Sequence, residues 1–324
     1  MKVLSILATT SIPLAMIFTH RQIDSLEKLG VENQSFYIHA QGLTIPKLVR
    51  IIRDLRRTIK EFNPDLVHVQ YGMVYAFIAA FSNCCPLVIT FHGSDLNTIP
   101  GEGFLRTVIK KTMSNLAVLR ARQVICVSRI VRKNLWWKKG KSNIIPLGIN
   151  LEEFQPMDKA TARKQLHWKE NEVVVLFNAN NPILKRLDIA EQTIAIVKRS
   201  IPQARLEVLD AKGDNRKWIP FIINASDCLL LCSDSEGSPT MVKEAMACDI
   251  PVVGVDVGDV KERLDGVKPS IVTEKEPHAL ARAIVEVVQS DVPSNGRTRL
   301  NEDHLSEEAV AKVIYGVYQK VLTK

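Results

Sequence analysis

The sequence predicts an α/β fold made of two doubly wound domains, each with a parallel sheet. The chain has 324 residues, 46% of them apolar, which is more than one compact core usually contains. Short apolar runs alternate with helical patterns from end to end, as in parallel sheets covered on both faces. Pro146, Gly148 and Pro156 interrupt this alternation near the middle. We therefore expect one domain over 1–148 and a second over 149–324.

The first half alternates six predicted strands with four predicted helices. The strands are expected at 3–8, 35–38, 65–70, 86–93, 123–128 and 143–148. The helices are expected at 21–29, 46–62, 104–121 and 129–138. The opening run also resembles a secretory signal peptide, with Lys2 ahead of apolar residues. Pro13 interrupts that run early and favours a buried strand, and no later run is long enough to predict a transmembrane helix.

The second half repeats the same alternation. Strands are expected at 172–179, 205–210, 228–233 and 251–256, and helices at 187–199, before Asp227, at 240–247 and at 306–322. Glu307 and Glu308 suit the start of the last helix, because acids are favoured at the positive end of a helix dipole. Doubly wound domains bind ligands at the carboxyl ends of their strands, so we expect the site there.

The charge of the chain is unevenly distributed. Residues 1–150 contain 20 Lys and Arg but 8 Asp and Glu, a net charge of +12, whereas the remainder has a net charge of −4. This asymmetry predicts a polyanionic partner for the first half, although a well-solvated lysine-rich surface would also explain it. An anionic membrane is favoured over nucleic acid, because no nucleic-acid reader motif accompanies the basic residues.

The cysteines show no metal-binding pattern. Nearly all lie in apolar runs, and no pair has zinc-ligand spacing beside a second pair. The six are Cys84, Cys85, Cys126, Cys228, Cys232 and Cys248. We expect buried free thiols, a reducing cytoplasm and no metal site.

The richest functional pattern is the stretch 232–257. A predicted strand ends near Cys232, a polar loop follows, and a helix begins at about Thr240. The unpaired N–H groups and dipole of a helix start can bind phosphate without a metal. Gly237 allows a ligand to approach the backbone, and the Ser238 hydroxyl is a candidate donor.

Two glutamates flank this turn. Glu236 lies in the loop, and Glu244 lies one turn into the helix with seven residues between them. Carboxylates accept paired hydrogen bonds from vicinal hydroxyls, as on a hexose or a ribose. An ordinary exposed position for Glu244 would also fit its spacing, but the neighbouring apolar residues already supply the helix's buried face.

A second cationic pattern follows the strand expected at 172–179. Lys185 and Arg186 are expected at the head of the next helix, where their charges would oppose the helix dipole. A bound diphosphate would resolve this conflict, whereas a solvent-facing pair is the alternative. In the first half, a strand ends at His92, Gly93 and Asp95, which makes His92 a candidate for the site or a structural hydrogen bonder.

The run SDSEGSPTMVKEAMACDIPVV resembles the paired-glutamate motif of family 4 type glycosyltransferases with the GT-B fold. HGSD and PLGIN are similar to further family elements, so the resemblance covers most of the chain. It implies two Rossmann-like domains facing each other across a cleft, with the C-terminal helix crossing back to the first. It also implies retaining, metal-independent transfer of a hexose-type sugar from a nucleotide diphosphate to a glycan or lipid-linked acceptor, in cell-surface polysaccharide biosynthesis.

The resemblance implies roles for individual residues. Glu236 would contact the donor sugar and Glu244 the ribose, while His92, Lys185 and Glu236 would form the catalytic set. The implied donor-binding residues are Asn180, Lys185, Arg186, Glu236, Gly237, Ser238, Pro239, Thr240, Met241 and Glu244. The implied acceptor-binding residues are His92, Gly93 and Asp95, with Asp95 supporting His92.

The chain departs from the family pattern in three places. The segment 9–20 has no glycine, where similar enzymes have a glycine-rich loop. Ala179 and Asn180 stand where a Gly-Arg pair usually precedes the lysine, so Arg186 is expected to supply the second cation. Residues 211–224 are too few for the further strand and helix that commonly help to hold the base. A nucleotide-sugar epimerase of the same fold and a non-catalytic subunit therefore remain alternatives.

A basic and aromatic surface is expected in the first half. The predicted helix 104–121 combines Phe104 and Leu105 with several cations, and Trp136 and Trp137 precede more lysines. Such a surface suits peripheral docking at the inner face of a membrane, consistent with a lipid-linked acceptor. The alternative is that the apolar residues of 104–121 form the core face of the helix.

Overall fold

The structure is a computed structural model that describes residues 1–9, 16–82, 85–210 and 216–323. It separates into two compact units. The first contains Met1–Gly148 and Glu307–Lys324, and the second contains Ile149–Ser306. The division at 148 and 149 coincides with the position expected from Pro146 and Gly148.

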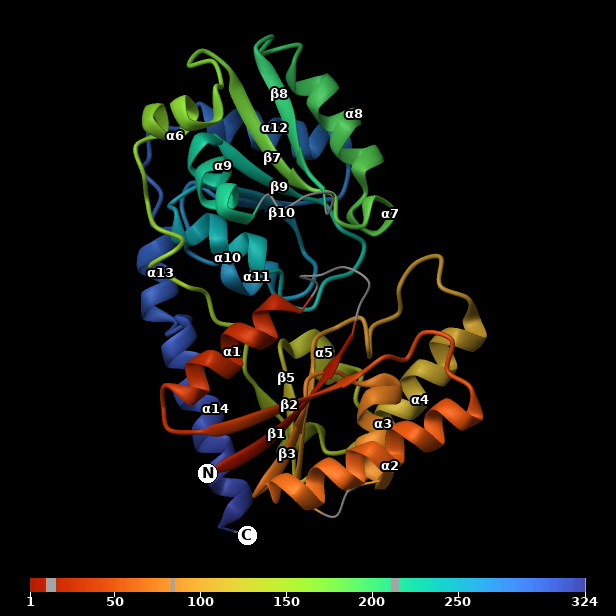
Figure 1. Cartoon of the computed structure of the whole chain (residues 1–324). Helices are drawn as coiled ribbons and strands as arrows, with labels where there is room; N and C mark the ends of the chain where they lie inside the picture. The colour runs from red at the N-terminus through yellow and green to blue at the C-terminus, as the bar shows by residue number, and fades with distance from the viewer. Residues whose placement is uncertain (10–15, 83–84, 211–215, 324) are drawn as a thin grey trace. The chain divides into compact units, whose positions relative to one another are not determined.

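The first unit is built on a six-stranded parallel sheet in the order β2-β1-β3-β4-β5-β6 (Figure 1). Its strands are β1 (Lys2–Ala8), β2 (Glu32–Ile38), β3 (Leu66–Val69), β4 (Leu87–Phe91), β5 (Gln123–Cys126) and β6 (Asn143–Ile144). The chain passes from β1 to β2 in one direction and from β3 onward in the other. The topological switch point, where doubly wound sheets bind ligands, therefore lies between β1 and β3.

Helices cover both faces of this sheet. They are α1 (Ile17–Glu27), α2 (Ile45–Phe62), α3 (Met73–Ser82), α4 (Phe104–Arg120), α5 (Arg129–Lys133) and α14 (Glu307–Leu322), with a 3₁₀ turn at Lys139–Lys141. Helices α3 and α4 pack together on one face, and α1 packs against α14 on the other (Figure 1). Helix α3 was not predicted, because its run MVYAFIAAFS is apolar on nearly every side and lacks a helical period.

The C-terminal helix corrects the predicted domain ranges. Residues 307–322 were assigned to the second domain, but α14 belongs to the first unit. Its buried face, which includes Val310, Ile314 and Val317, packs against α1 and β3. Burial of this apolar stripe is what fixes the helix there.

Helix α4 presents apolar side chains to solvent. Phe104 is 85% exposed, Leu105 70% and Ile109 49%. The buried face of α4 contains Ala117 and Val118, so the alternative that its first apolar residues form a core face is wrong. Lys110, one of the cations of this helix that were expected on the basic surface, is buried and donates to Glu102.

The second unit contains a five-stranded parallel sheet in the order β11-β10-β9-β7-β8. Its strands are β7 (Val173–Asn178), β8 (Ala204–Leu209), β9 (Cys228–Leu231), β10 (Val252–Val255) and β11 (Ile271–Thr273). The chain moves from β7 to β8 in one direction and from β9 to β11 in the other. The switch point of this sheet therefore lies between β7 and β9.

The helices of the second unit are α6 (Lys159–Leu166), α7 (Pro182–Lys185), α8 (Leu187–Val197), α9 (Ile219–Ala225), α10 (Thr240–Ala247), α11 (Val260–Arg263), α12 (Pro277–Val288) and α13 (Gly296–Glu302), with a 3₁₀ turn at Arg216–Trp218. Helices α8 and α12 pack together, as do α10 and α13. The described residues between β8 and β9 form only the 3₁₀ turn and α9, as the short spacing in the sequence led us to expect.

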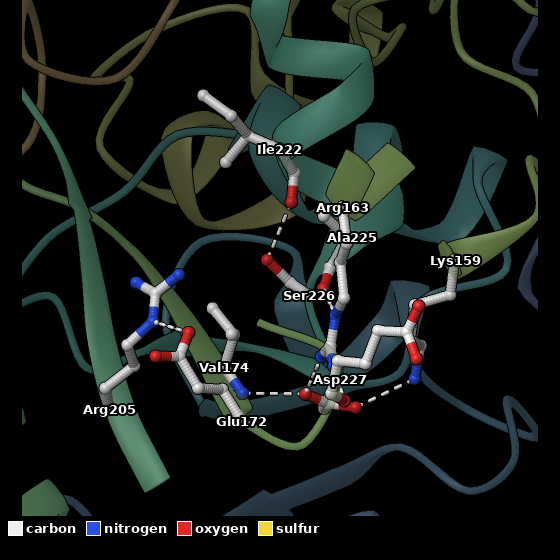
Figure 2. A network of polar contacts seen from close by, with 10 residues as sticks. Lys159, Arg163, Glu172, Val174, Arg205, Ile222, Ala225, Ser226 and Asp227 are labelled. Carbon is white, nitrogen blue, oxygen red and sulfur yellow. Dashed lines mark hydrogen bonds and ion pairs between the residues drawn. The ribbon is translucent and has the colours of Figure 1, made fainter. Parts of the chain in front are cut away.

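A charged network joins the amino ends of β7 and β9 (Figure 2). Asp227, just before β9, accepts hydrogen bonds from the backbone N–H of Val174 at 2.6 Å and from Arg163 at 2.8 Å. Lys159 donates to its other oxygen at 2.8 Å. Because it lies at the opposite ends of the strands from the expected ligand site, we interpret this network as structural.

Cys126, Cys228, Cys232 and Cys248 are free and buried, as expected, and Cys85 is half-buried. Cys84 and residues 10–15 of the glycine-free segment 9–20 lie outside the described residues. In the described part of the chain, no helix combines the length and the apolar character that crossing a membrane requires.

Candidate functional site

Two loops meet at the carboxyl edge of the second sheet, on either side of its switch point. One follows β7, includes the short helix α7 and contains Lys185, and the other follows β9 and contains Glu236. The backbone N–H of Asp234 donates to the carbonyl of Leu184 at 2.9 Å. The Cys232 thiol also lies 3.5 Å from two carbonyls of the first loop. These contacts hold together residues that are about fifty positions apart.

Lys185 and Glu236 form an ion pair at this junction. Lys185 Nζ donates to Glu236 Oε1 at 2.5 Å, and the Ser233 hydroxyl donates to the same oxygen at 2.6 Å. The side chains are 19% and 10% exposed, so a ligand can still reach both. The structure thus brings together the cation and the first carboxylate that the sequence singled out.

The position of Lys185 corrects the sequence analysis. It lies in the last turn of the short helix α7, which begins at Pro182. Asn181, the residue before this helix, accepts a hydrogen bond from the backbone N–H of Leu184 at 3.2 Å. A lysine at a helix C-terminus is favoured by the dipole, so the expected conflict does not arise there. Asn180 is exposed in the loop ahead of this helix.

Arg186 is compensated within the protein. It has a left-handed backbone, with φ of 64°, and precedes α8. Its guanidinium donates to both oxygens of Asp188, at 2.9 and 2.8 Å, and to Asp234 at 3.4 Å. The Asp188 hydrogen bond is the main cause of its raised pKa. Two carboxylates therefore supply much of the compensation that we had expected from a diphosphate.

Helix α10 provides the expected helix start beside this pair. It begins at Thr240 after Pro239, and among the described residues no side chain caps it. Its first backbone N–H groups are thus suited to bind an anion. Gly237, Pro239 and Met241 are buried, and Glu244 is half-buried one turn into the helix.

Ser238 differs from its expected role. Its side chain is 5% exposed, and its hydroxyl donates to Asp259 at 2.8 Å and accepts from Lys243 at 2.9 Å. The hydroxyl therefore stabilises the loop through its hydrogen bonds to Asp259 and Lys243, and only the backbone of Ser238 can contact a ligand.

Sequence reasoning missed Lys243, Asp259 and Gly258, which support the loop. Lys243 is fully buried, and burial lowers its pKa to about 8. The only sequence signal was a lysine among the apolar residues of α10. Gly258 has φ of +62°, and a Cβ there would lie 2.9 Å from the Cβ of Glu236.

An unexpected cavity of about 640 Å³ opens beside the second loop. Ser233 and Asp234 line it together with residues that follow β10 and β11, including Asp256, Lys261 and Glu274. Lys275 crosses this edge to bond Asp234. This cavity could not be predicted from the sequence, because strand β11 was not predicted.

In the first unit, His92 directly follows β4 and is half-buried. The ring of Phe18 lies 4.9 Å from it, and the ring of Tyr71 stacks on it at 5.8 Å. Gly93 has φ of +127°, a conformation that favours glycine. The two aromatic rings restrict the plane of the imidazole.

Asp95 is not available to an acceptor. It is fully buried, and its carboxylate accepts backbone hydrogen bonds from Gly72 at 2.9 Å, His92 at 3.1 Å and Gly93 at 2.9 Å. Burial raises its pKa despite these bonds. Asp95 therefore shapes the turn that holds His92, which is the supporting role expected for it, and the acceptor-binding assignment is wrong for this side chain.

The described residues contain no group of three or more His, Cys, Asp or Glu side chains arranged to hold a metal ion.

Comparison with known proteins identifies the family. Residues 16–153 match the family described as Glycosyltransferase Family 4, and residues 166–290 match Glycosyl transferases group 1. The chain belongs to the family 4 type glycosyltransferases with the GT-B fold. Both the family and the fold class predicted from the sequence are confirmed.

Among curated relatives, the putative teichuronic acid biosynthesis glycosyltransferase TuaC of Bacillus subtilis is 28% identical over 72% of this chain. The chain covers 64% of that protein, and 32% and 40% of the next two relatives it matches.

Solved structures share the fold at low identity. Sucrose-phosphate synthase of Thermosynechococcus elongatus has a TM-score of 0.80 at 17% identity, covering all of both chains. Anabaena HepE in complex with UDP-glucose has a TM-score of 0.75 at 17% identity, covering 99% of this chain and 100% of that one.

Proposed function

We propose that this protein is a retaining glycosyltransferase that moves a hexose-type sugar from a nucleotide diphosphate to a glycan or lipid-linked acceptor. The observation that supports this most directly is the contact between Lys185 and Glu236 beside the start of α10. A cation, a carboxylate and the N–H groups of a helix start are what a sugar diphosphate requires. Family membership makes group transfer the reaction that this arrangement serves.

In the proposed mechanism, the protein stabilises the leaving diphosphate without a metal. Lys185 turns from Glu236 toward the phosphates, and the first N–H groups of α10 bind the same negative charge. Arg186 stays with its two carboxylates and contributes at longer range. The bond between the anomeric carbon and the diphosphate oxygen breaks as the acceptor hydroxyl attacks on the same face, so the configuration of the sugar is retained. The proton of the hydroxyl passes to the departing diphosphate oxygen.

The remaining residues hold the donor and the acceptor. Glu236 accepts hydrogen bonds from hydroxyls of the sugar, and Glu244 from the ribose. We assign to His92 a contact with the transferred sugar or the acceptor, and to Gly93 the backbone turn that presents it. We infer the acceptor class from the relative TuaC, a putative teichuronic acid biosynthesis glycosyltransferase, and propose that the reaction belongs to cell-surface polysaccharide biosynthesis.

We further propose that the protein works in the cytoplasm, bound reversibly to the inner face of the membrane. The supporting surface, here called the α4 surface, comprises Phe104, Leu105, Arg106, Val108, Ile109, Lys111, Trp136, Trp137 and Lys139. Trp136 N donates to Asn115 of α4 at 2.7 Å, which places the tryptophans against that helix. Exposed apolar side chains among cations suit an anionic bilayer.

Binding of nucleotide sugars to the purified chain tests the function first. A thermal-shift panel of UDP-, GDP- and ADP-sugars should show one class that raises Tm, because a ligand of the native state stabilises it by mass action. UDP-glucose is the first probe, since a structural relative was solved with it. If no nucleotide sugar binds, the chain is a non-catalytic subunit and the proposal is wrong.

Product analysis then distinguishes the reaction types. NMR of the product should show the anomeric configuration of the donor, and inversion would contradict the retaining mechanism. Conversion of the donor to its epimer without any acceptor would instead establish the epimerase alternative. Activity that survives EDTA is expected for metal-independent transfer.

A further inference from the structure

A buried chain of polar side chains runs from the C-terminal helix to His92. The Tyr318 hydroxyl lies 2.6 Å from His68 Nδ1, although 250 positions separate the two residues. Gln70 Nε2 lies 3.3 Å from the same nitrogen, and Gln70 Oε1 lies 3.3 Å from His92 Nε2. His68, Gln70 and Tyr318 are all fully buried.

The sheet explains why these side chains meet. His68 and Gln70 are two positions apart at the end of β3, and Thr90 and His92 are two positions apart at the end of β4. Side chains two apart along a strand point to the same face, and His68 pairs with Val88 in register. All four therefore lie on one face, and α14, which packs against β3, brings Tyr318 to it.

The protons along this chain can be assigned from hydrogen-bond chemistry. Tyr318 has His68 as its partner in the described structure, and a phenol is a better donor than an aliphatic hydroxyl, so Tyr318 donates to His68 Nδ1. His68 then carries its proton on Nε2 and donates to Thr90 Oγ1 at 2.7 Å. Burial lowers the pKa of His68 to about 3, which keeps the ring neutral.

Gln70 transmits this assignment to His92. The single lone pair of His68 Nδ1 accepts from Tyr318, and the Gln70 amide N–H₂, 3.3 Å away, is a second and weaker donor to it. The reverse orientation of the amide would set its oxygen against that lone pair, so the Gln70 carbonyl oxygen is directed at His92 Nε2. A carbonyl can only accept, and His92 must therefore carry its proton on Nε2. Burial also lowers the pKa of His92 to about 3, so Nδ1 keeps its lone pair at neutral pH.

The Nδ1 atom of His92 is where this chain ends. It is buried and has no hydrogen-bond partner among the residues that the structure describes. A buried acceptor without a partner costs about 1 to 3 kcal/mol, and one at a strand's carboxyl end is placed to accept from a ligand. Phe18 and Tyr71 hold the ring plane that directs this atom.

We propose that Gln70, and Tyr318 through His68, are positioning residues that fix His92 as the Nε2–H tautomer, so that Nδ1 accepts a hydrogen bond from a hydroxyl of the transferred sugar or its acceptor. This inference rests on the proposed function. The C-terminal helix α14 then does more than pack against the sheet, because the hydrogen bond that Tyr318 donates to His68 determines where the other side chains of this network carry their protons.

NMR of protein with ¹⁵N-labelled histidine tests the tautomer directly. In the wild-type protein near pH 7.5, the His92 signals, assigned by their loss in His92→Asn, should show a protonated Nε2 and an unprotonated Nδ1. A protonated Nδ1 would overturn the proposal. This measurement requires no substrate and no activity.

Substitutions of Gln70 and Tyr318 test the effect of these hydrogen-bonded side chains on turnover. Gln70→Met should yield both tautomers of His92 and lower kcat about tenfold with little change in the donor KM, the loss expected for one misdirected hydrogen bond. Tyr318→Phe fills the same space and should show a smaller loss of the same kind. Tyr315→Phe, on the same helix and half-buried, is the matched control and should behave as wild type.

The outcomes separate this inference from the proposed function. Wild-type kcat in folded Gln70→Met would overturn the positioning role, as would a change confined to KM. An active wild-type enzyme with a protonated His92 Nδ1 would refute the inference alone. The expected tautomer in a protein without transferase activity would refute the proposed function and leave no substrate hydroxyl for Nδ1, which also ends this inference.

Discussion

Lys185 Nζ lies 2.5 Å from Glu236 Oε1, across 51 positions of sequence. Each side chain follows a different strand, and the strands β7 and β9 are hydrogen-bonded neighbours. The contact therefore results from the sheet order and marks the switch point. Each residue also compensates the charge of the other, and in the proposed mechanism a bound diphosphate replaces this contact.

Lys185→Ala should chiefly slow turnover. The lysine is proposed to stabilise charge that develops on the leaving diphosphate, so its loss should lower kcat about 100-fold with a smaller effect on the donor KM. Steady-state kinetics with the donor found in the thermal-shift panel measure this. Lys198→Ala, which removes an exposed lysine after α8, is the control. A wild-type kcat in Lys185→Ala would contradict the assignment.

Glu244→Ala should chiefly weaken donor binding. A hydrogen bond to a carboxylate contributes about 1.5 to 3 kcal/mol, so Kd should rise about tenfold or more. Because the ribose is the proposed contact, the free nucleotide and the nucleotide sugar should be weakened equally, as calorimetry can show. A 2′,3′-dideoxy nucleotide should bind wild type and variant alike. Weakening confined to the nucleotide sugar would reassign Glu244 to the sugar.

Gly258→Ala should displace the loop that contains Glu236, because the added methyl group would be too close to that loop. Its φ of +62° strains any other residue, and the new Cβ would lie 3.0 Å from the carbonyl oxygen of Gly237. We expect a loss of about 1 to 3 kcal/mol in stability and weaker donor binding. Gly266→Ala is matched, because φ is +72° there but the nearest atom is 4.0 Å away. If both variants bind donor equally well, the steric contact is unimportant.

The sequence predicted the sheets and the main loops because their signals are local. Apolar runs bounded by Gly and Pro located most strands, and the paired glutamates located α10. Helix α12 and strand β11 were missed, since β11 has only three half-buried residues and the loops around it hold no recognised motif. Arg186 was misinterpreted because its partners Asp188 and Asp234 cannot be paired from spacing alone.

The buried polar partners were the hardest part of the site to predict. Asp95 and Ser238 were assigned to ligands because their motifs place them near the site. Their oxygens are instead used by backbone groups and by Lys243. The series of hydrogen bonds through His68 depends on Tyr318, which lies on α14. Only the folded structure brings α14 against β3, so the sequence could not predict this contact. No periodicity in the sequence predicts a contact between residues so far apart.

Acid should destabilise the first unit through His68. Its folded pKa of about 3 lies below the ordinary value of 6.5, so the unfolded chain binds the proton first. The contribution is complete above about pH 6.5 and is lost as pH falls toward 3, by up to about 1.4 kcal/mol per pH unit. Urea unfolding at pH 7.5, 6.5 and 5.5 measures the slope. His68→Gln should reduce the slope by about half, because the pKa of His92 is lowered in the same way and its contribution stays. An unchanged slope would contradict the buried neutral state of His68.

The α4 surface should bind anionic vesicles. Phe104 and Leu105 are 85% and 70% exposed, and transfer of this apolar area to a bilayer is favourable by about 25 cal/mol per Å². Nearby cations each add about 1 kcal/mol at an anionic surface, an attraction that salt weakens. Vesicles with anionic lipid should therefore sediment the protein at low salt and release part of it at high salt.

A double variant distinguishes vesicle binding by the α4 surface from nonspecific adsorption of the protein to vesicles. Phe104→Ser with Leu105→Ser should weaken vesicle binding at least about tenfold, because it removes the insertion of apolar side chains and leaves the charges in place. Val292→Ser removes a side chain that is 48% exposed on the second unit and should bind as wild type does. Equal binding by both variants would mean that charge alone holds the protein to the bilayer. No binding by the wild type at low salt would exclude membrane docking by this surface.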